Sequence, residues 1–390
     1  MIQKAFKFRI YPDSEQSEKL AVQFGCMRFV YNYYRRVRED YYQETGTGLN
    51  YFDCATDLTD RLKVDYPWLK DADSQAMQQA LKDLDKAYGN FFAGRADYPT
   101  FKRKHDKQSF RYPQRFRVEG GNVYLPKVGW VKLVQHRRIE GKMKNATVSK
   151  TKTGKYFVSI QCEIEHVTPT QKPDSVGIDL GLSSFAILST GEKIDSPKYL
   201  RKAERLLRIR QRRLSRKIKG SNSRGQARHV VATIHERVTN QRKDFHHKLS
   251  RQIVDQFGCI GLETLNVRGM VKNHKLAKSI NDAGWAQFVQ FATYKTAWAG
   301  GQIVKHDRWF ASSKTCSDCG AVNQSLQLRD RTWVCISCGS IHDRDVNAAI
   351  NLIPTTVGAT ERYAGGYMNS VVEHSAPEKF QVPDLEAQAL

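Results

Sequence analysis

The sequence predicts an α+β protein of several domains: an antiparallel β-barrel with an inserted helical bundle, followed by an α/β domain with a cysteine-rich insertion. Short runs of alternating apolar and polar residues occupy 4–10 and 114–167, and amphipathic helical patterns separate them. After residue 175, strands alternate with long helices. Two tight cysteine pairs follow. A chain of 390 residues can form two or three domains with cores of their own.

The first strand, expected over 4–10, has no partner strand next to it in the sequence. We therefore expect it to join the strands that follow residue 113, so that the helices between them form an insertion. These helices are expected to begin at Asp13, which has Gln16 three residues later as in a capping box, to continue around 50–64, and to end with a helix from Asp73 to about Phe92. The barrel is assigned to 1–12 and 113–170, and the helical insertion to 13–112.

Two segments of the insertion are candidates for contact with nucleic acid. One face of the third helix repeats Gln and Lys at helical spacing, and it is either a solvated face or a ridge that reads bases and holds phosphates. Residues 98–112 interleave basic and aromatic side chains, which suits phosphate contact plus base stacking; the alternative is a plain basic loop. The candidate residues are Gln75, Gln79, Lys82, Lys102, Arg103 and Lys104.

The net charge indicates a polyanionic partner. The chain has 63 Lys and Arg against 40 Asp and Glu, a formal net charge of +23, which is most often the mark of a nucleic-acid-binding protein. A basic membrane protein is the alternative, but no apolar run approaches 18 residues, and the N-terminus lacks the apolar core of a signal peptide. We therefore expect a cytoplasmic, nucleoid-associated protein without a membrane partner.

The second half begins with two adjacent strands over 176–188 and a short one at 193–194. Residues 201–220 form a helical region with ten Lys or Arg and one acid, which predicts contact with phosphates, because a solvated face normally mixes charges. A long helix ending at Gly258, a strand at 259–263, a helix over 280–298 and a strand at 302–305 follow. Within the basic region the candidate residues are Arg208, Arg212 and Arg216.

Three acids lie at separate strand or helix ends: Asp179, Glu263 and Asp345. Each alone has an ordinary structural explanation, as a turn residue, a strand-end charge or a helix N-cap. A mixed sheet could bring them together, and three carboxylates in one place need a cation to offset their repulsion. Oxygen ligands suit Mg²⁺ or Mn²⁺, and a pair of such ions can hydrolyse a phosphodiester.

The clustered cysteines predict a zinc site. Cys316 and Cys319 form one C-x₂-C pair and Cys335 and Cys338 another, each followed by a glycine, with fifteen residues between the pairs. Four thiolates at this spacing bind Zn²⁺ as a closed structural site. Because the four sulfurs complete the coordination, His342 is left out. The insertion over 311–340 is expected to present Lys314, Arg329, Arg331 and Trp333 to nucleic acid.

The motifs around these residues resemble the TnpB (OrfB-type) family of transposon-encoded RNA-guided DNA nucleases, relatives of type V CRISPR effectors. The resemblance spans residues 2–354 and is carried by GIDLG, LETLNVRGM, SSKTCSDCG, CISCG and DRDVNAAINL, and by KAFKFRIYP and YPTFKRKHDKQSFRYP nearer the N-terminus. It implies that the barrel is a wedge domain and the helical insertion a recognition domain. It further implies an RNase H-like (RuvC) nuclease over 171–310 and 341–354, with the zinc ribbon as its target-nucleic-acid module.

The resemblance also implies partners and roles. The nuclease acids would be Asp179, Glu263 and Asp345, the last chosen over Asp343 because it lies two residues before Asn347. The partners would be double-stranded target DNA and a guide RNA from the transposon end, with one protein per RNA. Gln75 and Gln79 would help read a short motif beside the target. Alternatives are a nuclease-inactive RNA-guided regulator and an accessory transposase. Residues 355–390 are expected to form a flexible tail.

Overall fold

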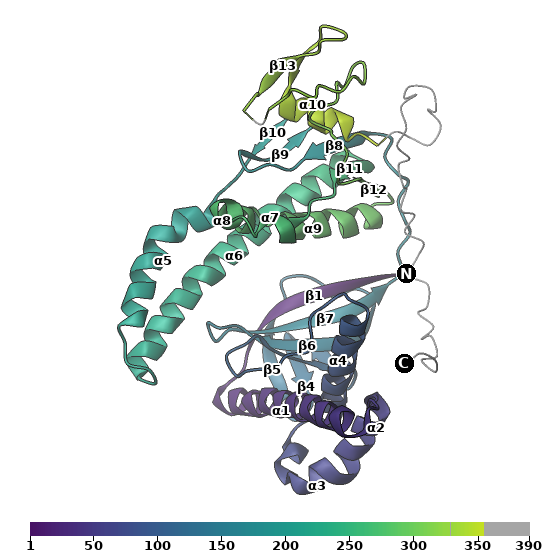
Figure 1. The fold of residues 1–390 in the computed structure, drawn as a ribbon. Coiled ribbons are helices and arrows are strands. Elements are labelled where there is room, and N and C mark those ends of the chain that lie inside the picture. The colour runs from purple at the N-terminus through teal and green to yellow at the C-terminus, as the bar shows by residue number, and fades with distance from the viewer. Residues whose placement is uncertain (328, 355–390) are drawn as a thin grey trace. The chain divides into compact units, whose positions relative to one another are not determined.

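A computed structural model of the chain describes residues 1–327 and 329–354 (Figure 1). The tail expected over 355–390 lies outside the described residues. The chain forms two compact units. The first comprises Met1–Val167 and Arg213–Thr233, and the second comprises Thr168–Arg212 and the chain from Ile234 onward. In the described ranges, no helix combines the length and the apolarity that crossing a membrane requires.

The first unit is built on a seven-stranded antiparallel sheet in the order β2-β6-β7-β1-β5-β4-β3. The expectation for the first strand is confirmed, because β1 (Ile2–Tyr11) lies in the middle of the sheet, paired with β7 and β5. Its inward side chains are fully buried, as the alternating pattern predicts. The other strands are β2 (Gln108–Tyr112), β3 (Arg117–Glu119), β4 (Asn122–Leu125), β5 (Gly129–Val134), β6 (Lys142–Lys150) and β7 (Tyr156–Ile164).

Two features of this sheet differ from expectation. Within the described residues no ladder joins the edge strands β2 and β3, so the sheet curls but is not closed by hydrogen bonds into the expected barrel (Figure 1). Strand β2 also belongs to the sheet, although the sequence analysis placed it in the helical insertion. The alternation of β2 turns Phe110 and Tyr112 into the core, so these two aromatic rings are not free to stack on bases.

The helices of this unit lie between β1 and β2 in the chain. Helix α1 (Ser14–Thr45) begins with the expected capping box, in which the Asp13 carboxylate accepts from the Gln16 backbone N–H at 2.8 Å. The second helical region runs from α2 (Tyr51–Asp57) through a π-helical turn into α3 (Lys63–Asp65). Helix α4 (Ser74–Phe92) packs its apolar stripe against α1 and β2.

The second unit contains a five-stranded mixed sheet in the order β10-β9-β8-β11-β12. Strands β8, β9 and β10 pair antiparallel, and β11 runs parallel to both β8 and β12. Parallel neighbours end at the same edge of a sheet, which brings the C-terminal residues of β8, β11 and β12 together. The strands are β8 (Ser175–Asp179), β9 (Ser184–Leu188), β10 (Lys193–Asp195), β11 (Cys259–Glu263) and β12 (Gln302–His306).

Helices cover both faces of this sheet (Figure 1). Helix α10 (Arg344–Asn351) packs on β8 and β9 on one face, while α6 (Asn222–Gln256) and α9 (Trp285–Trp298) supply apolar side chains to the core on the other. The helix expected over 280–298 is wrong as a single helix, because Gly284 adopts a left-handed conformation (φ 66°) and ends α8 (His274–Ala283) before α9 begins. The remaining helices are α5 (Tyr199–Ser215) and α7 (Val267–Met270).

Candidate active site

Two of the three predicted acids end neighbouring parallel strands. Asp179 is the last residue of β8 and Glu263 the last of β11. The register pairs Ile178 with Leu262, one residue before each acid, so both carboxylates leave the sheet at the same edge. Neither acid is exposed, because each follows directly on a buried strand. A parallel pair of buried strands therefore places two partly buried carboxylates side by side.

The third acid comes from α10, which approaches the sheet unusually closely. A Cβ atom at Gly177 would lie 1.9 Å from the carbonyl oxygen of Ala349, and one at Gly261 would lie 1.7 Å from that of Leu352. No side chain fits at either position, so both strands need glycine there for the helix to pack. This contact holds the C-terminal half of α10 against the middle of β8 and β11, and the same helix carries Asp345 in its first turn.

The electrostatics of Asp179 link it to the other two acids. Burial, together with the nearby carboxylates of Asp345 and Glu263, raises the pKa of Asp179 to about 7, while Arg344 opposes this shift. Burial also raises the pKa of Glu263. The edge therefore favours a bound cation, since a positive charge there would relieve both the desolvation and the mutual repulsion of the carboxylates.

The two acids of the DRD segment have different surroundings. Asp343 is the N-cap of α10: its carboxylate accepts from the backbone N–H groups of Asp345 and Val346, each at 3.1 Å, and from Lys193 Nζ at 2.5 Å. Burial alone would raise the pKa of Asp343, but these hydrogen bonds lower it overall. The capping role suggested as the ordinary explanation for Asp345 thus belongs to Asp343, and Asp345 is the acid whose charge Asp179 feels.

Two arginines lie beside Asp345. Its carboxylate is 3.4 Å from a guanidinium nitrogen of Arg331 and 3.6 Å from one of Arg344. Arg331 precedes strand β13 (Thr332–Val334) of the cysteine-rich segment and is largely exposed. One end of this segment therefore adjoins the acidic edge. The carboxylate oxygens of the three acids are not gathered as tightly as the sulfurs described next, and their sharing of metal ions stays a prediction.

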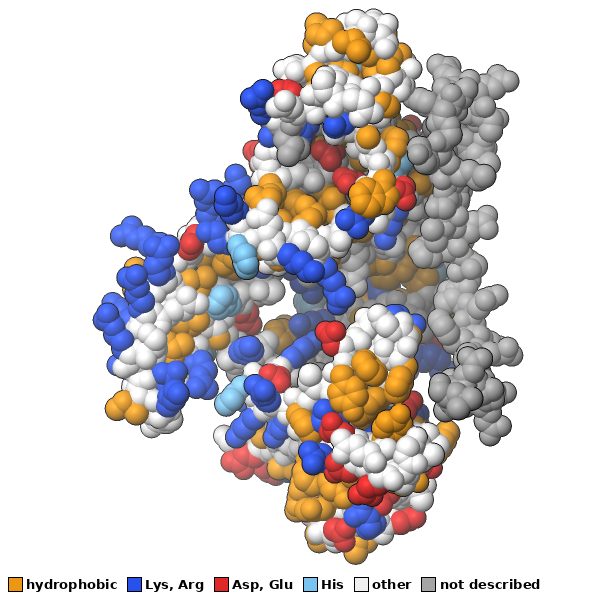
Figure 2. Space-filling view, in the orientation of Figure 1, with side chains coloured by type: hydrophobic (Ala, Val, Ile, Leu, Met, Phe, Trp, Pro, Cys, Tyr) orange, Lys and Arg blue, Asp and Glu red, His pale blue; other side chains and the backbone are white. Residues whose placement is uncertain are grey.

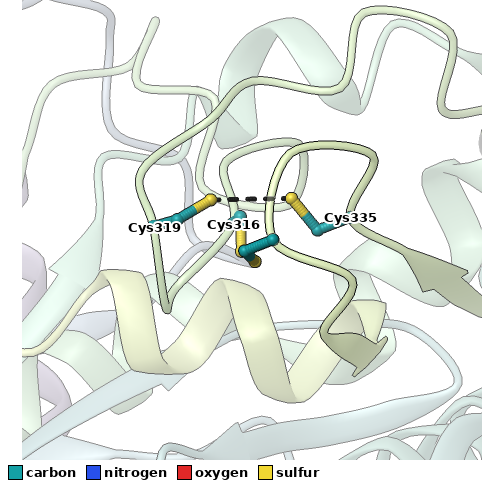
Figure 3. Close-up of side chains that lie close together, drawn as sticks. Cys316, Cys319 and Cys335 are labelled. Atoms are coloured by element: carbon teal, nitrogen blue, oxygen red, sulfur yellow. Dashed lines mark hydrogen bonds between the residues drawn. The ribbon is translucent and has the colours of Figure 1, made fainter.

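The four predicted cysteines form a compact group of potential metal ligands, with all four sulfurs within 4.8 Å of one another (Figure 3). Cys319 Sγ lies 3.6 Å from Cys335 Sγ, and Cys316 Sγ lies 3.7 Å from Cys338 Sγ. Tetrahedral Zn²⁺ with bonds of about 2.3 Å requires sulfurs about 3.8 Å apart. The donor set and its spacing therefore fit a zinc ion.

One residue near the cysteines, Trp333, differs from expectation, and His342 makes a contact that was not predicted. Trp333 was expected to face nucleic acid, but it is 7% exposed and packs on His342, with ring centroids 4.8 Å apart. The reason is the pairing of β13 with β14 (Ile341–Asp343), which places these two rings opposite each other on the inner face. His342 Nε2 lies 3.0 Å from Cys316 Sγ, a contact that cysteine spacing alone could not reveal.

The predicted nucleic-acid residues fall into separate groups. In α4, Gln79 lines a cleft with Lys102 and Arg103, Gln75 is half-buried with an unpartnered Oε1, and Lys82 is exposed. Lys102 Nζ lies 3.7 Å from the ring centre of Tyr31. The remaining candidates are Lys104, which is exposed beside this cleft, Arg208 and Arg212 on α5, and Arg216, which follows the end of α5.

Basic side chains gather over the hairpin formed by α5 and α6 (Figure 2). Leu207 is the one fully buried residue of α5, and Arg208, Arg212 and Arg216 are all exposed. Arg208 has one acidic neighbour, Glu204, at 3.5 Å. A helix with so little apolar contact and so much positive charge is suited to a polyanion rather than to a protein core.

Family models match three parts of the chain. Residues 159–274 match the OrfB family of IS605, described as “Probable transposase”. Residues 285–352 match “Cas12f1-like, TNB domain”. Residues 1–47 match a “Helix-turn-helix domain”, although the described structure of that segment is β1 followed by a single helix, α1.

Curated relatives match along nearly the whole chain. A protein of Streptomyces pristinaespiralis named “Putative RNA-guided DNA endonuclease” is 40% identical over 366 residues, 92% of this chain and 90% of the relative. The InsQ protein of Escherichia coli K12, with the same description, is 32% identical over 90% of this chain and 91% of its own length. A “TnpB-like protein” of Acanthamoeba polyphaga mimivirus is 26% identical over 52% of this chain and 41% of the relative.

Two solved structures are also similar. One, of a Cas12f1 complex with sgRNA and target DNA, has 18% identity and a TM-score of 0.35, and covers 90% of this chain and 99% of that one. The other, of a CRISPR-Cas12f ternary complex, has 14% identity and a TM-score of 0.37 over 87% of this chain and 81% of that one. On the strength of the full-length relatives, the chain belongs to the TnpB (OrfB-type) family.

Proposed function

We propose that this protein is a transposon-encoded, RNA-guided DNA endonuclease that depends on divalent metal ions. The observation that carries the proposal is the sheet edge at which Asp345 and Glu263 help to raise the pKa of Asp179, in a protein of net charge +23. A carboxylate cluster suits metal-assisted phosphodiester hydrolysis, and the positive surface suits the substrate. The relatives along nearly the whole chain are named as RNA-guided DNA endonucleases, and this name supports a guide RNA and a DNA target here.

Different residues of the chain would bind the metal ions and position the acids. Asp179, Glu263 and Asp345 would hold Mg²⁺ or Mn²⁺, which activates water and stabilises the leaving oxygen of the cleaved strand. Close packing of α10 on Gly177 and Gly261 supports a constant spacing between the helix that carries Asp345 and the strands that carry Asp179 and Glu263. The mixed sheet, with two parallel strands and a helix supplying the acids, supports an RNase H-like (RuvC) nuclease domain.

The zinc ion would have a structural role, and the ribbon around it would contact the target nucleic acid. Its four sulfurs leave no open coordination position for substrate. Asn347 and Asn351 of α10 donate hydrogen bonds to carbonyl groups of Ser312 and Thr315, so the loop that leads into Cys316 is tied to the helix that carries Asp345. Zinc would therefore support the active site through α10.

Recognition would use the first unit and the basic hairpin. The cleft lined by Gln79, Lys102 and Arg103 supports contact with target DNA beside the guided site, and we propose that Gln75 and Gln79 of the same helix take part in that contact. The exposed arginines of α5 support binding of RNA or of the RNA–DNA duplex through its phosphates. We propose a guide RNA from the transposon end, one protein per RNA, and a short motif read next to the target.

The test begins with the RNA that co-purifies with the protein. Sequencing it identifies the guide, and a matching DNA target is then incubated with the complex and Mg²⁺. We expect the parent to cut and Asp179→Ala to bind RNA and DNA without cutting. The matched control is Asp195→Ala, an exposed strand-end acid of β10, which should cut normally.

Other outcomes would select other functions. Binding of RNA and DNA without cutting by the parent would indicate an RNA-guided regulator. Transposon excision with this protein as the sole transposon product would indicate a transposase. That outcome would agree with the description of the matching family, “Probable transposase”. Full cutting by Asp179→Ala would refute the assignment of the acids.

A further inference from the structure

Trp309 is an exposed aromatic residue close to the acidic edge. It is 80% exposed, although most tryptophans bury most of their surface. It lies three residues after His306, the last residue of β12, which pairs in register with Glu263. Three residues of chain span at most about 11 Å, so Trp309 lies within reach of the strand ends that carry the acids.

The backbone around Trp309 is held in place. The Trp309 N–H donates to the Asp307 carboxylate at 2.7 Å, and the Phe310 N–H donates to the Asp307 carbonyl at 3.2 Å. The ring of Phe310 stacks on His306, with centroids 5.5 Å apart at 26°. Phe310 therefore anchors the turn on β12, while the Trp309 ring has no such core partner among the residues that the structure describes and is largely exposed.

One cation lies beside the exposed ring. The Arg308 guanidinium lies 4.8 Å from the centre of the Trp309 ring. An aromatic face beside an arginine suits a nucleotide, since the base can stack while the arginine contacts the phosphate. Duplex DNA offers no free base faces along its length, so the matching ligand is an unpaired strand.

We propose that Trp309 stacks on an unpaired base of the DNA strand that is being cut, within a few nucleotides of the scissile phosphate. The proposal rests on the proposed function for the identity of that strand. The ring would hold the strand as it enters the acidic edge, and Trp309 would be a positioning residue because it orients the strand without taking part in the reaction. Sequence preference would be weak, because every base offers a π-face.

The test measures binding apart from cutting. The zinc-loaded protein with its co-purified RNA, carrying Asp179→Ala, is titrated with a fluorescein-labelled oligothymidylate and with the same backbone lacking bases. We expect Trp309→Ala to weaken binding of oligothymidylate by about 5- to 150-fold, and Trp309→Phe to restore part of the loss. Binding of the abasic strand should be the same with and without Trp309→Ala.

A matched control is Ile336→Ala, which removes a 91% exposed apolar side chain from the same zinc-bearing segment and should leave both affinities unchanged. Zinc content reports folding of every variant. Equal affinity of parent and Trp309→Ala for oligothymidylate would refute the stacking, as would an equal loss on both probes. The result is independent of cleavage, so the stacking can fail while the nuclease assignment stands, and the reverse.

Discussion

Substitution of Gly261 tests whether the close packing of α10 on β11 determines the positions of the three acids. In Gly261→Ala the new methyl group would lie 1.7 Å from the carbonyl oxygen of Leu352, whereas ordinary contacts begin near 3.4 Å. Helix and strand must separate by about 1.7 Å, because both partners are backbone atoms in a close-packed interior. Displacements of about 1 Å can cost a factor of about 100 in rate, and overpacking costs about 1–3 kcal/mol in stability.

We therefore expect Gly261→Ala to cut target DNA at least about 100-fold more slowly than the parent while still co-purifying with RNA. Single-turnover cleavage with Mg²⁺ measures the rate, and circular dichroism and zinc content show whether the variant is folded. Gly177→Ala, whose methyl group would lie 1.9 Å from the Ala349 carbonyl oxygen, should behave similarly. If folded Gly261→Ala cuts at the parental rate, close packing of α10 does not position Asp345.

The control for this pair is Gly25→Ala in α1. A methyl group there would meet nothing within 4 Å, and the residue is helical. Alanine in a helix is more favourable than glycine by about 0.5–1 kcal/mol, so this variant should be as active as the parent and slightly more stable.

Three further predictions concern the acids, the zinc and the link between them. With zinc bound and no added Mg²⁺, Asp179→Asn should stabilise the protein at pH 8 by up to about 4 kcal/mol and have no such effect at pH 4, as measured by denaturant unfolding. The folded-state pKa of about 7 lies above the usual 3.8, so the cost of charging Asp179 appears as pH rises between these values. Cys335→Ser should lose zinc, measured by atomic absorption, and expose the segment to protease, whereas the buried Cys259→Ala should keep zinc. Asn347→Ala should cost about 1–3 kcal/mol and loosen the loop around Cys316, because the Ser317 N–H loses its acceptor and the Ser312 and Thr315 carbonyls keep Asn351 as a side-chain donor; unchanged hydrogen exchange in that loop would contradict this.

Local pattern predicted much of the fold, because many elements carry their own signal. The alternation of β1, the capping box at Asp13 and the two cysteine pairs each depend on residues a few positions apart. The pairing of β1 followed from a different argument, the absence of a local partner. Such features can be read from a sequence because the interactions that determine them are local or have few alternatives.

The errors arose where partners distant in the sequence decide the environment. Tyr112 alternates with polar residues in β2 and Trp333 lies in a strand of three residues, and only the pairing of those strands decides which side faces inward. The exposed ring of Trp309 gave no signal, because an aromatic residue after a strand is usually part of the core.

The order of the elements along the chain has a consequence for synthesis. The sheet strands β8 and β11 precede α10, which is the last helix of the described residues and carries Asp345. A ribosome completes the strands before it completes the helix, so two of the three acids are present while the third is still untranslated. On the proposed assignment, a nascent or prematurely terminated chain that ends before residue 344 would be unable to cut DNA, whatever RNA it had already bound.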